Sequence, residues 1–154
     1  MFKLVNPVID FSVRELCYKP YYNHRRGCPN WNKRKSCPPK LLTIDKILDL
    51  EKPIYIIYNC YNFLEHTKKM RKLHPDWTNR QVECCLYWQG TARKQLKAEI
   101  KRFLREYRGY YIESCPEGAG VNITETMKQV GIELEWPPKN YSYQVVLAGI
   151  LLKN

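Results

Sequence analysis

Three cysteines lie close together near the start of the chain, in the 21-residue run from Cys17 to Cys37. Thiolates bind zinc and iron–sulfur clusters, and their bonds to a metal can supply folding energy where a hydrophobic core is missing. The run is rich in proline and cations and has almost no hydrophobic periodicity, so core packing does not explain how it would be ordered. Metal binding is therefore the first chemistry that the sequence indicates.

Proline follows three of the seven cysteines, namely Cys28, Cys37 and Cys115. A Cys-Pro pair also occurs in the bacterial ferredoxin ligand run. Cys115 ends a predicted strand, and the glycines after it form a loop that could approach a bound group closely. The predicted metal ligands are Cys17, Cys28, Cys37 and Cys115.

The spacing of these cysteines favours an iron–sulfur cluster, of the [4Fe-4S] type, over zinc. Structural zinc sites usually contain a tight Cys-x2–4-Cys pair, whereas the gaps here are 10, 8 and 77 residues. Cluster thiolates attach to different irons and tolerate wider gaps. Zinc and a metal-free protein stay open as alternatives, and the fourth ligand could be Cys17, His24, Cys115 or an exogenous group. A cluster would imply an electron-transfer, redox or sulfur-related role.

Two patches of the chain resemble a known family. The Cys-Pro and Cys-Pro-Pro elements at Cys28 and Cys37, with the later Pro-Glu-Gly-Ala-Gly-Val-Asn-Ile-Thr segment from Pro116, are similar to the uncharacterised prokaryotic family of small cysteine-rich predicted metal-binding proteins. The resemblance implies metal binding through Cys28 and Cys37, and it implies no particular reaction.

Two segments carry the whole positive excess of a chain whose net charge is +11. Residues 16–43 have seven cations and no acidic residue, and residues 91–109 have a net charge of +5, which leaves −1 for the rest. Aromatic residues Tyr18, Tyr21, Tyr22 and Trp31 interleave with the first set, a mixture typical of nucleic-acid binding. A zinc-stabilised nucleic-acid-binding module is therefore the alternative function. The expected partner is either a nucleic acid, with RNA favoured over DNA, or an acidic redox protein. The candidate contact residues are Arg25, Arg26, Lys33, Arg34, Lys35, Arg93, Lys97, Lys101 and Arg105.

Hydrophobic periodicity predicts a single α+β domain over residues 1–154. An irregular metal-binding loop at 17–40 precedes an α/β sandwich at 53–154, whose mixed sheet of about four strands is covered mainly on one face. The predicted strands cover residues 53–61, 110–114, 132–136 and 141–152. The predicted helices cover 62–73, 78–107 with a basic stripe, and 122–130.

Most familiar enzyme motifs are missing from the sequence, which has no P-loop, dinucleotide-binding glycine pattern, His-Glu-x-x-His element or Gly-x-Ser-x-Gly elbow. Whether the protein is an enzyme stays open, with Cys84 beside the basic stripe as a weak candidate nucleophile. Cys60 and Cys85 are expected to be buried filler. No apolar run reaches the length of a membrane span, and residues 1–10 do not resemble a signal peptide, so we expect a cytoplasmic protein without a membrane partner.

Overall fold

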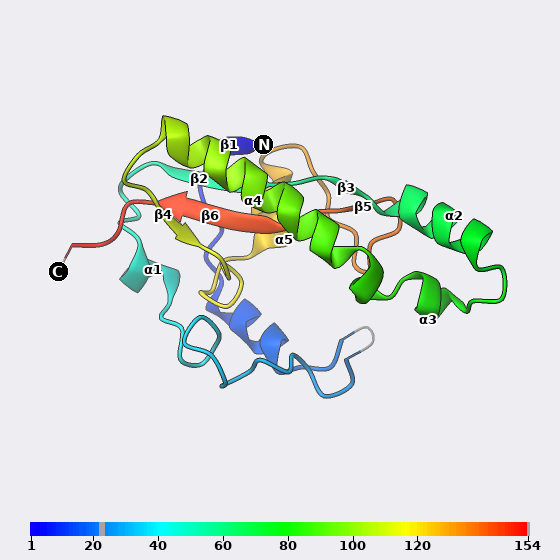
Figure 1. Ribbon diagram of the computed structural model, residues 1–154. Coiled ribbons are helices and arrows are strands. Elements are labelled where there is room, and N and C mark those ends of the chain that lie inside the picture. Colours follow the sequence, from blue (N-terminus) through cyan, green and yellow to red (C-terminus); the bar gives the residue numbers. More distant parts are fainter. Residues whose placement is uncertain (22–23, 154) are drawn as a thin grey trace.

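An antiparallel sheet of four strands lies at the centre of the computed structural model, which describes residues 1–21 and 24–153. The strand order is β1 (Phe2–Val5), β2 (Ile54–Tyr58), β6 (Val145–Gly149) and β4 (Tyr111–Glu113) (Figure 1). The predicted α+β class and four strands are confirmed. All three pairings are antiparallel, however, where the sequence predicted a mixed sheet.

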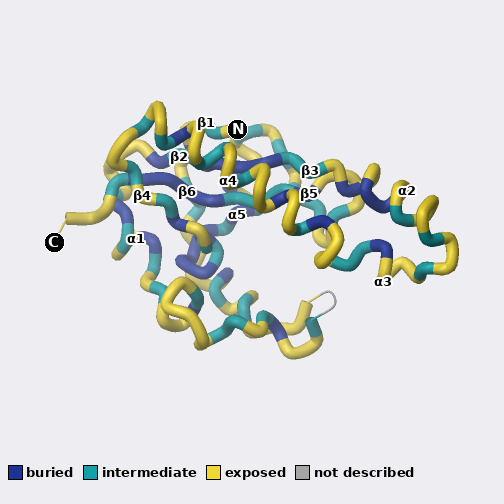
Figure 2. Tube along the Cα trace, viewed as in Figure 1, coloured by how far each residue is buried: buried dark blue, intermediate teal, exposed yellow. Residues whose placement is uncertain are grey.

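Both faces of the sheet are covered, as the β-branched and aromatic composition of β2 indicates. Ile54, Ile56 and Tyr58 belong to one core cluster, and Tyr55 and Ile57 to the other, because alternate residues of a strand point to opposite faces. Figure 2 shows buried residues along the central strands. The prediction of a sheet covered mainly on one face is therefore wrong.

Helix α4 (Gln89–Glu106) covers one face, and the two short helices α1 (Ile44–Ile47) and α5 (Ile123–Lys128) pack on the other. The side chain of Phe103 on α4 is fully buried against the sheet. The Asn122 side chain caps α5 by accepting a hydrogen bond from the Glu125 amide.

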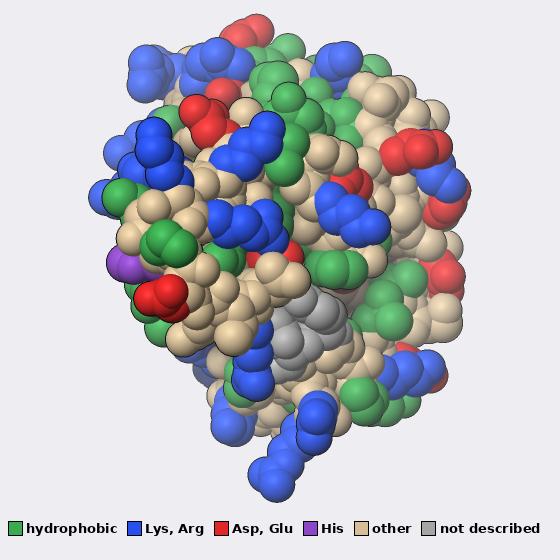
Figure 3. Space-filling view, turned by 90° about the vertical axis from the view of Figure 1, so that its right-hand side faces the viewer, with side chains coloured by type: hydrophobic (Ala, Val, Ile, Leu, Met, Phe, Trp, Pro, Cys, Tyr) green, Lys and Arg blue, Asp and Glu red, His purple; other side chains and the backbone are tan. Residues whose placement is uncertain are grey.

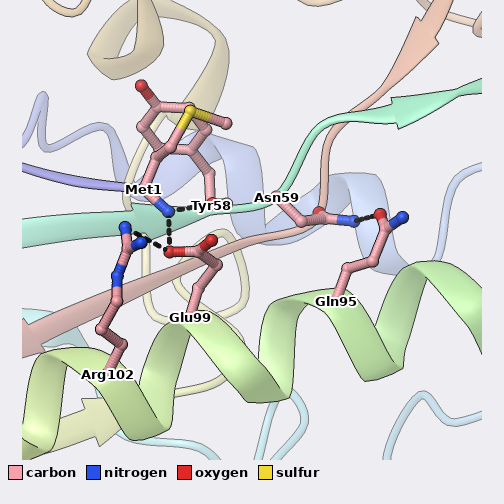
Figure 4. A network of polar contacts seen from close by, with 6 residues as sticks. All are labelled: Met1, Tyr58, Asn59, Gln95, Glu99 and Arg102. Atoms are coloured by element: carbon pink, nitrogen blue, oxygen red, sulfur yellow. Dashed lines mark hydrogen bonds and ion pairs between the residues drawn. The ribbon is translucent and has the colours of Figure 1, made fainter.

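Polar contacts hold α4 against β2 and the residue that follows it (Figure 4). The Met1 amino group donates to the Tyr58 carbonyl oxygen at 3.1 Å and pairs with the Glu99 carboxylate, which also binds Arg102 at 2.9 Å. The Asn59 side-chain amide donates to Gln95 on α4 at 3.2 Å. These contacts fix how α4 lies along the sheet.

The single helix predicted over 78–107 is instead three pieces: α3 (Asn79–Val82), a 3-10 turn η2 (Cys85–Tyr87) and α4. The predicted capping box of Thr78 and Gln81 is present. The chain turns at Trp88, whose indole N–H donates to the Glu83 carbonyl oxygen at 3.1 Å and whose ring is buried. Cys85 is consequently exposed, and its predicted burial is wrong.

Helix α2 (Phe63–Leu73) is confirmed with Asn62 as its cap, and with α3 it projects beyond the end of the sheet (Figure 1). A two-stranded ribbon of β3 (Tyr61–Asn62) and β5 (Tyr141–Ser142) lies at its base. No helix in the described part of the chain is long and apolar enough to cross a membrane.

The strand predicted over 132–136 is not formed. The Glu135 carboxylate instead accepts the backbone N–H groups of Lys139 and Asn140 at 2.7 and 3.0 Å, which closes a turn after this segment. Before residue 53 the structure has three elements that the sequence did not predict: β1, α1 and the 3-10 helix η1 (Phe11–Cys17).

Candidate metal centre

Electrostatic interactions link four cysteines from three segments of the chain. Cys17 ends η1, Cys28 and Cys37 lie in the loop that follows, and Cys115 lies in the loop after β4. Cys17 interacts electrostatically with Cys28 and Cys37, and Cys115 with Cys17 and Cys37. These four residues are the ones predicted as ligands, and we call them the cysteine cluster.

A backbone contact joins the first two cysteines. The Cys28 amide donates a hydrogen bond of 2.9 Å to the Cys17 carbonyl oxygen. Gly27 precedes it with φ +75°, and a Cβ at this position would lie 2.4 Å from the Tyr18 carbonyl oxygen. Only glycine fits such a left-handed position against a neighbouring backbone, so Gly27 is what lets Cys28 meet Cys17.

Close packing joins the other two cysteines. A Cβ added to Gly118 would lie 2.7 Å from the Cys115 sulfur and 2.9 Å from Cδ of Pro38, the residue after Cys37. The Cys115 loop therefore rests against the Cys-Pro-Pro element at a distance that only a glycine allows.

Hydrogen bonds anchor the Cys115 loop to the N-terminal region. The Asp10 amide donates to the Gly120 carbonyl oxygen at 2.9 Å, and the Ile44 amide donates to the Ala119 carbonyl oxygen at 2.8 Å. Because these bonds lie on either side of the Cys17–Cys37 segment in sequence, they hold that segment beside Cys115.

The cluster is a poor environment for free thiolates. Burial, followed by the nearby Cys17 and Cys37, raises the pKa of the Cys115 thiol to about 12, although a hydrogen bond from the Gly118 backbone opposes the shift. The pKa of Cys17 is raised by burial and then by Cys28, and Arg14 partly offsets this. A bound cation would relieve this repulsion, because it stabilises the deprotonated form of each ligand.

Two glutamates beside the cluster were missed by the sequence analysis. Glu113 is 2 % exposed, and its Oε1 accepts the Cys115 amide at 2.9 Å, while Oε2 has no partner among the described residues. Glu117 is partly buried and lies near Cys17. Burial raises the pKa of both carboxyl groups. An acidic residue at the inward position of a short strand, two residues before a candidate ligand, is the signal that could have identified Glu113.

Among the residues that the structure describes, no three His, Cys, Asp or Glu side chains are already arranged as the ligands of a metal ion. Electrostatic interactions join Cys17 to each of the other three thiols, and Cys37 to Cys115. His24 stacks on Tyr21 with ring centroids 4.5 Å apart.

The remaining cysteines are Cys60, Cys84 and Cys85, of which Cys85 interacts electrostatically with Tyr21 of the cysteine loop. Cys60 is only partly buried and forms a hydrogen bond with the Tyr143 side chain, so it is more than apolar filler. Cys84 is partly buried and Cys85 is exposed, the reverse of what a continuous helix predicted.

The candidate contact cations are exposed in both segments. The exposed cations of the cysteine loop are Arg25, Arg26, Lys33, Arg34 and Lys35. The exposed cations of helix α4 are Arg93, Lys97, Lys101 and Arg105. Within the described ranges none of these nine residues forms a salt bridge. Figure 3 shows Lys and Arg spread over much of one face, with acidic residues between them. Tyr22 lies outside the described residues.

Comparisons of the chain with protein-family models, with curated proteins and with solved structures found no match.

Proposed function

We propose that the protein binds a metal centre through the cysteine cluster, and that this centre is an iron–sulfur cluster with a redox, electron-transfer or sulfur-related role. The convergence of four cysteines from three segments supports the proposal most directly. These residues are separated by gaps of 10, 8 and 77 residues, so their proximity is a property of the fold and not of local sequence.

The loop around the cluster supports the same proposal. Side chains between Cys28 and Cys37 are mostly exposed, and the core clusters of buried residues include none of them. Bonds from thiolates to a metal would supply the ordering energy that hydrophobic burial does not. The exposed arginines and lysines would partly balance the negative charge of such a centre.

Each part of the chain has a defined task in this proposal. The iron–sulfur centre would be held by Cys17, Cys28, Cys37 and Cys115. Such a centre transfers single electrons, and with only three thiolates bound it offers an iron with an open coordination position. Gly27 and Gly118 let the ligand-bearing loops approach. Glu113 positions Cys115 by accepting its amide hydrogen. Basic residues on the loop would dock an acidic redox partner by charge complementarity.

The proposal is tested by the metal content of protein purified without oxygen, for the wild type and for single Cys→Ser variants. We expect Cys28→Ser and Cys37→Ser to lose most of the bound iron and sulfide. The matched controls Cys60→Ser and Cys84→Ser should keep it, because both residues lie outside the cysteine cluster. Equal retention of iron in all four variants would contradict the ligand assignment.

A zinc-stabilised nucleic-acid-binding module is the second candidate, and a specific surface feature favours it. Tyr18 and Trp31 pack with ring centroids 4.9 Å apart among the exposed cations of the cysteine loop. Rings stack on unpaired bases and cations neutralise phosphates, so the expected partner is single-stranded RNA. The test is RNA affinity at several salt concentrations. A steep salt dependence, reduced in an Arg25→Ala, Arg26→Ala double variant, would support this function, and RNA binding that is undetectable at low salt would reject it.

A further inference from the structure

A pocket of about 200 Å³ opens beside the cysteine cluster. A single water needs only roughly 10–15 Å³, so the pocket has room for a small organic molecule. Its wall includes Cys115, Glu117, Leu134, Trp136, Tyr143 and Val145. Glu117 also interacts with Cys17, and the pocket therefore borders the cluster through two of its wall residues.

Aromatic rings form one part of the wall. Trp136 is 67 % exposed, and its indole N–H donates to the Thr124 hydroxyl at 3.2 Å. The Tyr143 side chain forms a hydrogen bond with Cys60. Both polar atoms have partners within the protein, so these side chains offer the pocket mainly their rings.

The pocket wall carries an acidic group, whereas the protein as a whole has a net positive charge. Glu117 bears the only carboxyl group among the described residues that line the pocket, and these residues include no Lys or Arg although the net charge is +11. Anions would meet Glu117 and the cysteine cluster with no cation to bind them. An ammonium group, in contrast, could pair with a carboxylate and lie against aromatic ring faces.

We propose that this pocket binds a small organic cation, an amine or quaternary ammonium compound with an aromatic or aliphatic body. The ammonium group would lie near Glu117, and the apolar body would contact Trp136, Tyr143 and Leu134. The pocket walls alone support this inference, which goes beyond the function proposed above. If a metal is bound, the ligand would lie next to it.

The test uses three probes of one shape and different charge: benzylammonium, benzyl alcohol and benzoate. Each is titrated by calorimetry into the purified full chain. We expect benzylammonium to bind at least about tenfold more tightly than benzyl alcohol, a difference of about 1.4 kcal/mol. Benzoate is expected not to bind. Benzoate binding as tight as that of benzylammonium would overturn the proposal, as would no saturation by benzylammonium at millimolar concentrations.

Two variants and a control locate the site. Glu117→Gln should weaken benzylammonium binding about tenfold and leave benzyl alcohol unchanged, in line with the loss of one charge pair. Trp136→Ala, at an exposed position, should weaken both probes without affecting folding, which keeps the test decisive if the Glu117 variant is unstable. The control Glu133→Gln changes an exposed glutamate and should bind like the wild type. Unchanged benzylammonium binding in both pocket variants would refute the assignment.

Metal content is measured on every sample, so that this proposal and the proposed function can fail separately. If the protein binds the probes but holds no iron or zinc, the missing metal contradicts the metal centre and the probe binding supports the pocket assignment. A metal-loaded protein that binds none of the probes would reject the pocket assignment alone.

Discussion

The backbone N–H of Cys28 lies 2.9 Å from the carbonyl oxygen of Cys17, to which it donates a hydrogen bond. This bond closes a loop of basic residues and brings two candidate ligands together through backbone geometry. For the proposed metal centre, this contact would lower the entropy cost of ordering the two ligands.

Gly27→Ala should disrupt this arrangement. The residue has φ +75°, and the new Cβ would lie 2.4 Å from the Tyr18 carbonyl oxygen, so the loop must shift. Left-handed backbone alone costs about 1–2 kcal/mol for a residue with a Cβ. We expect less bound metal per chain and a lower melting temperature. Gly90→Ala is the control, because its Cβ meets nothing within 4 Å and alanine favours the α4 helix. If both variants keep the full metal content, Gly27 does not position Cys28.

Gly118→Ala should separate metal binding from folding. Its Cβ would lie 2.7 Å from the Cys115 sulfur and 2.9 Å from Pro38 Cδ, so one of them must shift. The central sheet and α4 lie outside this contact, so we expect near-native circular dichroism together with reduced metal content. Full metal content in this variant would show that metal binding does not need the close packing at Gly118.

Metal binding should release protons and strengthen as the pH rises. Cys115, whose pKa is raised to about 12 by burial first, is protonated at neutral pH in the metal-free protein and must lose its proton to become a ligand. Calorimetric titration of the metal-free protein with Zn²⁺ in two buffers of different ionisation enthalpy measures the released protons. Zero release would contradict thiolate ligation.

Protonation of His66 should destabilise the arm formed by α2 and α3. Burial lowers the pKa of this imidazole, although a hydrogen bond to the Val82 carbonyl opposes the shift and nearby Lys69 adds to it. Because the pKa of His66 is lower in the folded than in the unfolded protein, the contribution of the neutral imidazole to the free energy of unfolding is complete above about pH 6.5. It is lost as the pH falls through the folded-state pKa.

Amide exchange of α2 and α3, followed from pH 7 to pH 5, checks this. Protection should fall with pH in the wild type, after correction for the intrinsic exchange rates. A His66→Gln variant should show little of this pH dependence. An identical pH dependence in the variant would remove His66 as the cause.

Local sequence signals predicted much of the fold correctly. The β-branched and aromatic run of β2 identified a strand, and the polar residue Asn62 marked the start of α2, because each signal depends on a few neighbouring residues. The broken helix could not be predicted in this way. Its break depends on Trp88 packing against Phe63, with ring centroids 5.2 Å apart, and this contact joins separate parts of the chain.

In the candidate site, too, local sequence patterns were predictable and tertiary contacts were not. Cys-Pro pairs and the clustering of cysteines near the start of the chain led to the four predicted ligands, between which electrostatic interactions are found. Glu113 could not be predicted from the sequence, because its contact with the Cys115 loop depends on burial and on one hydrogen bond that it accepts from the Cys115 amide. The pocket also depends on tertiary structure, since Glu117, Trp136 and Tyr143 have no shared sequence pattern.

The most direct measurement for the central claim is the ratio of iron to acid-labile sulfide in the wild-type protein, purified without oxygen, together with its visible absorption spectrum. An iron–sulfur centre predicts equal amounts of iron and sulfide and a broad absorption band at roughly 400 nm. A colourless protein that contains zinc, or no metal, would contradict the iron–sulfur assignment.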